Sequence, residues 1–175
     1  MLIDSYLKGA SQTDDHSIHL LFSANRWEAA AQIKSDIALG VNVIIDRYSY
    51  SGAVYSAAKN NPNLSLQWAW QPEVGLPRPD ICLFLGISTA EAAKRGGFGL
   101  ERYETDKMQT TVRQMFQELL SMPHNDEICI IDAGRAREEV AQDILEPVLE
   151  CMKNLDEIGP LRKFGPWSFV PGDRT

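Results

Sequence analysis

Asp46 and Arg47 stand side by side directly after the apolar run 41–45. That run is short, continuous and β-branched, which predicts a strand buried on both faces. An acid at the tip of such a strand, beside a nucleotide, can hold Mg²⁺ or its water molecules. The arginine next to it suits a phosphate group, because its planar fork donates two parallel hydrogen bonds. The alternative is a plain Asp-Arg loop pair, which is the commoner case for so short a motif.

Phe22 and Arg26 lie four residues apart in a segment of helical periodicity, so they share one face of the helix. A pyrimidine could stack on Phe22 while one of its carbonyls faces Arg26. Because arginine donates hydrogen bonds and accepts none, it favours O4 of thymine or uracil over the amino group of cytosine. Taken alone, each residue has a commoner role: Phe22 as a core residue and Arg26 as a solvated one.

Ser51, Gly52 and Tyr55 follow the Asp-Arg pair closely. Gly52 would let a backbone approach a ligand, and Tyr55 could line a nucleoside pocket or pack within a helix. Further on, Arg95 and Arg102 bracket a glycine-rich stretch that suits a mobile lid bringing cations onto phosphates. A flexible connection between two helices is the alternative there.

Buried strands alternating with helices form the framework expected to position these residues. We expect strands at 41–45, 80–85 and 127–132, and helices at 14–39, 49–59, 64–74, 88–95, 105–121 and 137–155, the last interrupted by Pro147. This alternation predicts an α/β domain with a parallel sheet flanked by helices. Ligands of such sheets bind outside the carboxyl ends of the strands. The residues expected at those ends are Asp46, Arg47, Asp132 and Ala133.

The composition of the chain bounds its partners and its surroundings. With 175 residues, 44% hydrophobic and 23% charged, the chain fits one soluble domain, expected at 1–158 and followed by a surface tail at 159–175. A net charge of −7 favours neither nucleic acid nor an anionic membrane, so a phosphorylated ligand must meet local cations. The three cysteines form no C-x-x-C pair, and no signal peptide opens the chain, so we expect the cytoplasm, with a nuclear pool left open.

Four blocks of the sequence together resemble eukaryotic thymidylate kinases. They are 19–28 (HLLFSANRWE), 46–52 (DRYSYSG), 75–80 (GLPRPD) and 98–104 (FGLERYE), in matching order and spacing up to about residue 155. The resemblance implies a P-loop nucleoside monophosphate kinase fold that phosphorylates dTMP to dTDP with ATP and Mg²⁺. It also implies a homodimer formed through helices, including the one that carries Phe22.

The resemblance assigns roles on the dTMP side of the site. It implies that Phe22 stacks on thymine, that Arg26 bonds O4, that Arg47 binds the dTMP phosphate and that Asp46 belongs to the magnesium shell. The residues implied to line the nucleoside pocket are Ser51, Gly52, Tyr55 and Tyr103, with Tyr103 against the sugar.

On the ATP side, the resemblance implies that Arg95 and Arg102 belong to the lid. It places the loop at Asp132 and Ala133 near the adenine. Arg102 is thus the lid residue expected to take part in catalysis, together with the Asp-Arg pair.

One departure concerns the P-loop. These 175 residues hold no G-x-x-x-x-G-K-[ST] sequence, and the lid interior 96–101 holds no basic residue that could replace its lysine. We therefore expect an N-terminally incomplete chain that lacks the first βαβ unit of the fold and turns over little by itself, because phosphoryl transfer depends on positioning and charge stabilisation. Two alternatives stay open: an inactive dTMP-binding or dimerising remnant, and a kinase for another nucleotide such as dUMP or for a deoxynucleoside.

Overall fold

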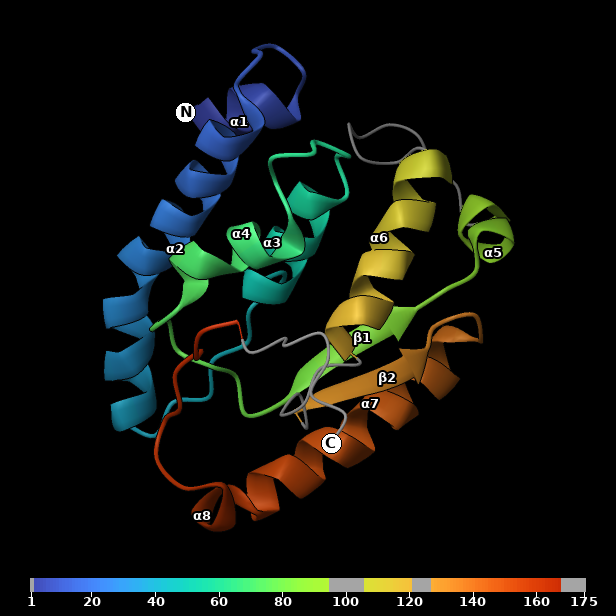
Figure 1. The fold of residues 1–175 in the computed structure, drawn as a ribbon. Coiled ribbons are helices and arrows are strands. Elements are labelled where there is room, and N and C mark those ends of the chain that lie inside the picture. Colours follow the sequence, from blue (N-terminus) through green and yellow to red (C-terminus); the bar gives the residue numbers. More distant parts are fainter. Residues whose placement is uncertain (1, 95–105, 121–126, 168–175) are drawn as a thin grey trace, which may run out of the picture.

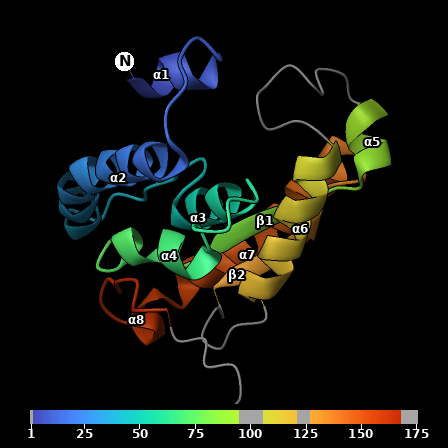
Figure 2. The ribbon, with the colours of Figure 1, turned by 45° about the horizontal axis from the view of Figure 1, so that its top comes forward.

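The computed structural model of this protein describes residues 2–94, 106–120 and 127–167. Within these residues, two parallel strands form the sheet, β1 (Cys82–Gly86) and β2 (Ile128–Asp132). Their register runs from Cys82 opposite Ile128 to Gly86 opposite Asp132. The ring of Phe84 on β1 packs against Phe116 of a helix at 4.5 Å between centroids. Helices lie on both sides of the strands (Figures 1 and 2), so the predicted α/β architecture with a parallel sheet is confirmed.

The helices follow the predicted ranges closely. They are α1 (Leu2–Leu7), α2 (Asp15–Ala38), α3 (Ser49–Ala57), α4 (Leu66–Trp70), the 3₁₀ turn η1 (Gln71–Glu73), α5 (Thr89–Lys94), α6 (Asp106–Leu120), α7 (Arg137–Lys153) and α8 (Leu155–Ile158). Asp14 caps α2 by accepting bonds from the backbone N–H groups of His16 and Ser17. The predicted cap of α5 is present too, because the Ser88 hydroxyl accepts the Glu91 N–H at 3.2 Å. Pro147 was expected to interrupt the last predicted helix, but α7 continues through it. α1 and α8 were not predicted.

The segment 41–45 is not a strand, which corrects the prediction. It runs as an irregular, exposed connection between α2 and α3, and the side chain of Ile44 is 97% exposed. A buried parallel strand needs neighbours for its backbone N–H and C=O groups. Within the described residues the sheet contains β1 and β2 alone, so the segment has no strand beside it. Asp46 and Arg47 therefore lie in a loop before α3 and not at a strand tip.

The hydrophobic core lies between α3, α4 and α6 and also takes in the C-terminal segment. Phe164 is only 3% exposed and contacts the rings of Tyr50 and Trp70. The described part of the tail, 159–167, lies mostly on the surface as expected, and Phe164 is the exception because its ring enters the core. The tail is held because its aromatic rings supply apolar area that the small core otherwise lacks.

A buried ion pair closes the core next to β2. The carboxylate of Glu127, with a fully buried side chain, accepts hydrogen bonds from the Tyr50 hydroxyl and from Arg78, whose Nε donates at 2.7 Å. Burial by itself would raise the pKa of Glu127, but the bonds from Arg78 and Tyr50 outweigh it and hold that pKa below its usual value. The carboxylate thus stays charged and joins α3, the approach to β1 and the start of β2.

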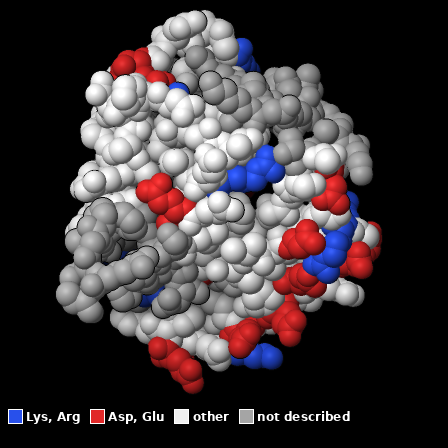
Figure 3. All heavy atoms as spheres, turned by 45° about the vertical axis from the view of Figure 1, so that its right-hand side comes forward, with Lys and Arg blue, Asp and Glu red and all other residues white. Residues whose placement is uncertain are grey.

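The surface carries the acidic character of the chain. Acidic side chains gather along the lower and right-hand parts of the face in Figure 3, with basic ones between some of them. No helix in the described ranges combines the length and the apolar composition that crossing a membrane requires.

Candidate functional site

Arg26 of α2 is held by a carboxylate that comes from the end of η1. Its Nε donates to Oε2 of Glu73 at 2.7 Å, and its Nη2 donates to Oε1 at 2.5 Å. The Arg26 side chain is 11% exposed and that of Glu73 is fully buried. This two-point pairing fixes the plane of the guanidinium, whose remaining N–H groups can serve another acceptor.

Gly52 of α3 lies directly against that guanidinium. A Cβ atom at Gly52 would come within 2.8 Å of both Nη atoms of Arg26 and within 3.0 Å of its Cζ. Glycine is therefore needed here for the close approach of the arginine, not for an unusual backbone angle. The structure brings together Arg26 and Gly52, two of the predicted substrate-binding residues.

Arg47 contacts the same helix, α3, one turn further toward the C-terminus of the helix. Its Cζ lies 5.0 Å from the centre of the Tyr55 ring, a cation–π contact, and Tyr55 follows Gly52 by three residues on α3. Arg47 itself has φ +61°, a left-handed conformation that costs a side-chain-bearing residue free energy. Two arginines from different segments thus meet one face of α3, and Ser51 belongs to the same helix. Backbone strain at such a position is typical of functional sites.

The other predicted residues on this side have simpler surroundings. Phe22 is half-buried on α2, one turn before Arg26, and Asp46 is exposed beside Arg47. Magnesium commonly takes one or two protein carboxylates and fills its remaining positions with water and substrate phosphate oxygens. An exposed carboxylate next to an arginine that the sequence analysis expects to bind a phosphate fits that pattern, although the described residues hold no cluster of three metal-binding side chains.

Buried polar side chains that the sequence analysis missed surround the Arg26–Glu73 pair. His19 Nδ1 lies 2.8 Å from the Ser56 hydroxyl, and Ser23 donates to the carbonyl of Pro72 at 3.1 Å. The signal for Glu73 was available: it is an acid in the segment 66–76, whose apolar neighbours predict burial, and a buried carboxylate needs a cation.

Tyr48 extends this polar group. Its hydroxyl oxygen is buried, and the structure gives it no hydrogen-bond partner among the described residues. Burial, and after it the nearby Glu73, raises the pKa of Tyr48 to about 12, while Arg26 opposes the shift. Tyr48 therefore offers a neutral hydroxyl at any ordinary pH, within electrostatic reach of the guanidinium.

His19 should make stability depend on pH. Burial lowers the pKa of His19 from its ordinary value of 6.5, and Glu73 offsets this only in part. The pKa of His19 is lower in the folded protein than in the unfolded chain, so the unfolded chain binds the proton more readily. The free energy of unfolding is therefore at its full value above pH 6.5 and declines as the pH falls below it, by at most about 1.4 kcal/mol per pH unit for one proton. Chemical denaturation at pH 7.5 and 5.5 measures this slope. His19→Gln should reduce it; an equal slope in the wild-type protein and the variant would contradict the assignment.

The residues assigned to ATP are not joined to this group. Asp132 ends β2 and Ala133 follows it, on the opposite side of the molecule from α2 (Figures 1 and 2). Asp132 accepts the Gly134 N–H at 2.9 Å and lies 3.7 Å from Nε of Arg135. The other residues predicted for this side and for the sugar lie outside the described residues; they are Arg95, Arg102 and Tyr103.

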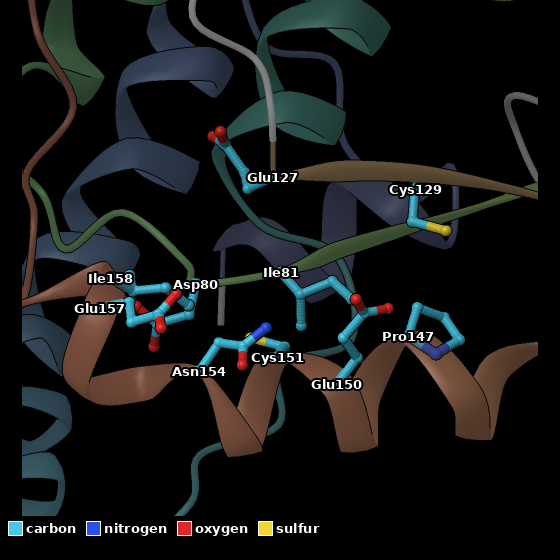
Figure 4. A pocket seen from close by; sticks show the side chains of 10 residues that line it. All are labelled: Asp80, Ile81, Glu127, Cys129, Pro147, Glu150, Cys151, Asn154, Glu157 and Ile158. Atoms are coloured by element: carbon cyan, nitrogen blue, oxygen red, sulfur yellow. The ribbon is translucent and has the colours of Figure 1, made fainter.

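A cavity of about 440 Å³ lies elsewhere, between the strands and α7 (Figure 4). Carboxylates of Asp80, Glu150 and Glu157 are among the side chains that line it, whereas the carboxylate of Glu127 points away toward Arg78 and Tyr50. A nucleotide phosphate would meet repulsion there. The predicted site residues within the described ranges do not line it, so we do not place the nucleotide in this cavity.

Comparisons with known proteins bear on the whole chain. The family model described as thymidylate kinase matches residues 1–144. The chain is 47% identical to thymidylate kinase of Danio rerio and 46% identical to that of Homo sapiens, each over 143 residues, which are 82% of this chain and 66% of each relative. The alignments thus span slightly less than two thirds of those relatives.

A solved structure agrees with the sequence comparison. The structure of thymidylate kinase from Candida albicans superposes with a TM-score of 0.78 at 36% identity and covers 95% of this chain and 78% of that one. The resemblance seen in the four sequence blocks is confirmed. The alternative of an inactive remnant gains no support from these relatives.

Proposed function

Because the chain belongs to the thymidylate kinase family, we propose that the protein transfers a phosphate group from ATP to dTMP and that the α2–α3 face binds the dTMP. The observation that carries this proposal is the convergence of Arg26 and Arg47 on one face of α3, at Gly52 and Tyr55. The two arginines present hydrogen-bond donors at separate points along α3, which suits a ligand with a base at one end and a phosphate at the other. In a chain of net charge −7, Arg47 is also the local cation that a phosphorylated ligand requires.

Arg26 would recognise the base. Glu73 occupies two of its five N–H groups, so three remain, and each of them can donate to a carbonyl such as O4. Phe22, one turn away on α2, would stack on the ring. Cytosine presents an amino group at that position, which is a hydrogen-bond donor like the N–H groups of Arg26. The two donors would face each other without an acceptor, so dCMP should be rejected.

Arg47 would bind the phosphate of dTMP, with Asp46 beside it in the magnesium shell. Magnesium, when bound, supplies charge stabilisation for the transferred phosphoryl group. Ser51, Gly52, Tyr55 and Tyr103 would line the nucleoside. For ATP we propose the lid residues Arg95 and Arg102 and the loop at Asp132 and Ala133.

We further propose a homodimer in the cytoplasm. Two large apolar side chains of α2 support a helical interface, since Leu20 is 46% exposed and Trp27 is 42% exposed. A helix that shows apolar side chains to solvent while its other face holds Arg26 is suited to pairing with a second copy.

Titration calorimetry with dTMP, dUMP, dCMP and ATP tests the function. We expect dTMP and dUMP to bind and dCMP to bind at least about tenfold more weakly, the effect of one unmet hydrogen bond at a desolvated site. Competition between dTMP and dUMP settles which of them is preferred. Equal affinity for dTMP and dCMP would contradict the role of Arg26, and no binding of any pyrimidine nucleotide would contradict the function.

Gly52→Ala gives a sharper test of the site. The new Cβ would overlap the Arg26 guanidinium, which Glu73 prevents from moving freely, so we expect the Kd for dTMP to rise about tenfold. Overpacking against a guanidinium held in a buried ion pair costs about 1–3 kcal/mol, and the better helix propensity of alanine offsets about 1 kcal/mol, so the free energy of unfolding should fall by no more than about 2 kcal/mol. Calorimetry and chemical denaturation of the variant measure the two quantities. An unchanged Kd would show that the base does not depend on this contact.

A further inference from the structure

The C-terminal segment 162–165 is bonded to the chain directly after Glu73. The Gly75 N–H donates to the carbonyl of Phe164 at 2.9 Å, and the Phe164 N–H donates to that of Leu76 at 3.0 Å. A third bond joins Arg78 N–H to the Arg162 carbonyl at 2.9 Å. These bonds form a short antiparallel pairing that fixes the course of the backbone on one side of η1.

The same segment also holds the chain just before η1. The Trp70 indole Nε1 donates to the carbonyl of Gly165 at 3.0 Å, and its ring meets Phe164 edge to face at 5.0 Å between centroids. Trp70 is the last residue of α4, and η1 follows it at once. The C-terminal segment 162–165 thus forms hydrogen bonds with the chain on both sides of the three-residue turn that ends in Glu73.

We propose that Glu73 and the 162–165 segment are positioning elements for the base-recognising arginine. The segment fixes η1, η1 presents the Glu73 carboxylate, and the carboxylate sets the plane of the Arg26 guanidinium. This inference rests on the proposed function and adds a role for the part of the chain beyond residue 144, where the family match ends.

The physical reason for such an arrangement is the flexibility of arginine. An unrestrained arginine must lose side-chain entropy when it meets a ligand, at a cost of about 0.5–1.5 kcal/mol per immobilised side chain. Pairing with a buried carboxylate means that this entropy has been lost before the ligand arrives. Removing the pairing should therefore weaken binding of dTMP and leave the rate of phosphate transfer from the bound complex unchanged.

The experiment compares Glu73→Gln with Glu127→Gln. Both carboxylates have fully buried side chains and pair with one arginine through two bonds, and Glu127 also accepts the Tyr50 hydroxyl, so Glu127→Gln should lose at least as much thermal stability as Glu73→Gln. We expect the KM for dTMP to rise about tenfold in Glu73→Gln, with kcat unchanged, and to stay at the wild-type value in Glu127→Gln. Equal KM changes in the two variants, or none in either, would overturn the proposal.

A second pair of variants tests the C-terminal segment. Phe164→Leu removes the ring that contacts Trp70, whereas Phe116→Leu removes a ring of α6 that contacts Phe84. We expect a higher KM for dTMP in the first variant and not in the second, while melting temperatures report the packing loss in both. If the wild-type protein binds no dTMP, the proposed function fails; if it binds dTMP and neither Glu73→Gln nor Phe164→Leu raises KM, only the positioning role fails.

Discussion

Replacing Arg47 with glycine should lower kcat/KM for dTMP by at least about 10²-fold, the usual effect of removing one donor aimed at developing charge. The fold should tolerate the change, because Arg47 is exposed and its φ of +61° is a value that glycine adopts without strain. Loss of activity without loss of stability would show that the Arg47 side chain serves ligand binding and not folding. Coupled ADP release and chemical denaturation of the same preparation measure the two effects.

Asn60→Gly is the matched control for that experiment. Asn60 is also exposed and also left-handed, with φ +57°, but it follows α3 and lies outside the proposed site. Its replacement should change neither kcat/KM nor, by more than about 1 kcal/mol, the free energy of unfolding. If Arg47→Gly and Asn60→Gly behave alike in both assays, Arg47 does not bind the phosphate.

Arg26→Met should have the largest effect on stability of any single change at the site. It would leave the Glu73 carboxylate buried without its cation, and breaking such a pair costs about 3–5 kcal/mol. For a domain of this size that corresponds to a fall in melting temperature on the order of 10 °C. Binding of dTMP should be lost as well, and calorimetry below the melting temperature of the variant checks it.

The double variant Arg26→Met/Glu73→Leu separates the two losses. Replacing both partners of a buried ion pair by apolar side chains is often neutral for stability, so most of the fall should be recovered. Binding of dTMP should stay absent, because the donor for the base is still missing. A double variant that regains dTMP affinity together with stability would show that Arg26 acts only through folding.

The sequence analysis succeeded where a local pattern decides the structure. The apolar runs at 80–85 and 127–132 became β1 and β2, and helical periodicity found most helices to within a few residues. The run 41–45 has the same local character and is not a strand, because pairing is decided by neighbours and not by the run itself. Local pattern thus located most helices, missed α1 and α8, and was only suggestive for strands.

The candidate site likewise contains residues that a local pattern identified and residues that it did not. Residue type and spacing on one helix were enough to select Phe22 and Arg26 as a pair. The partner of Arg26 was not foreseen, since Glu73 lies 47 positions further along the chain. The burial of Phe164 was missed for the same reason, because its contacts are with Tyr50 and Trp70 far away in the sequence.

The exposed segment 41–45 has a consequence for solubility. An uncharged β-branched stretch open to solvent is the type of sequence that stacks with copies of itself, and a charge at its border acts as a gatekeeper against such stacking. Asp46 is that charge here. Neutral replacements of Asp46, chosen to probe the metal, would therefore also promote aggregation, and light scattering should accompany every rate measured on them.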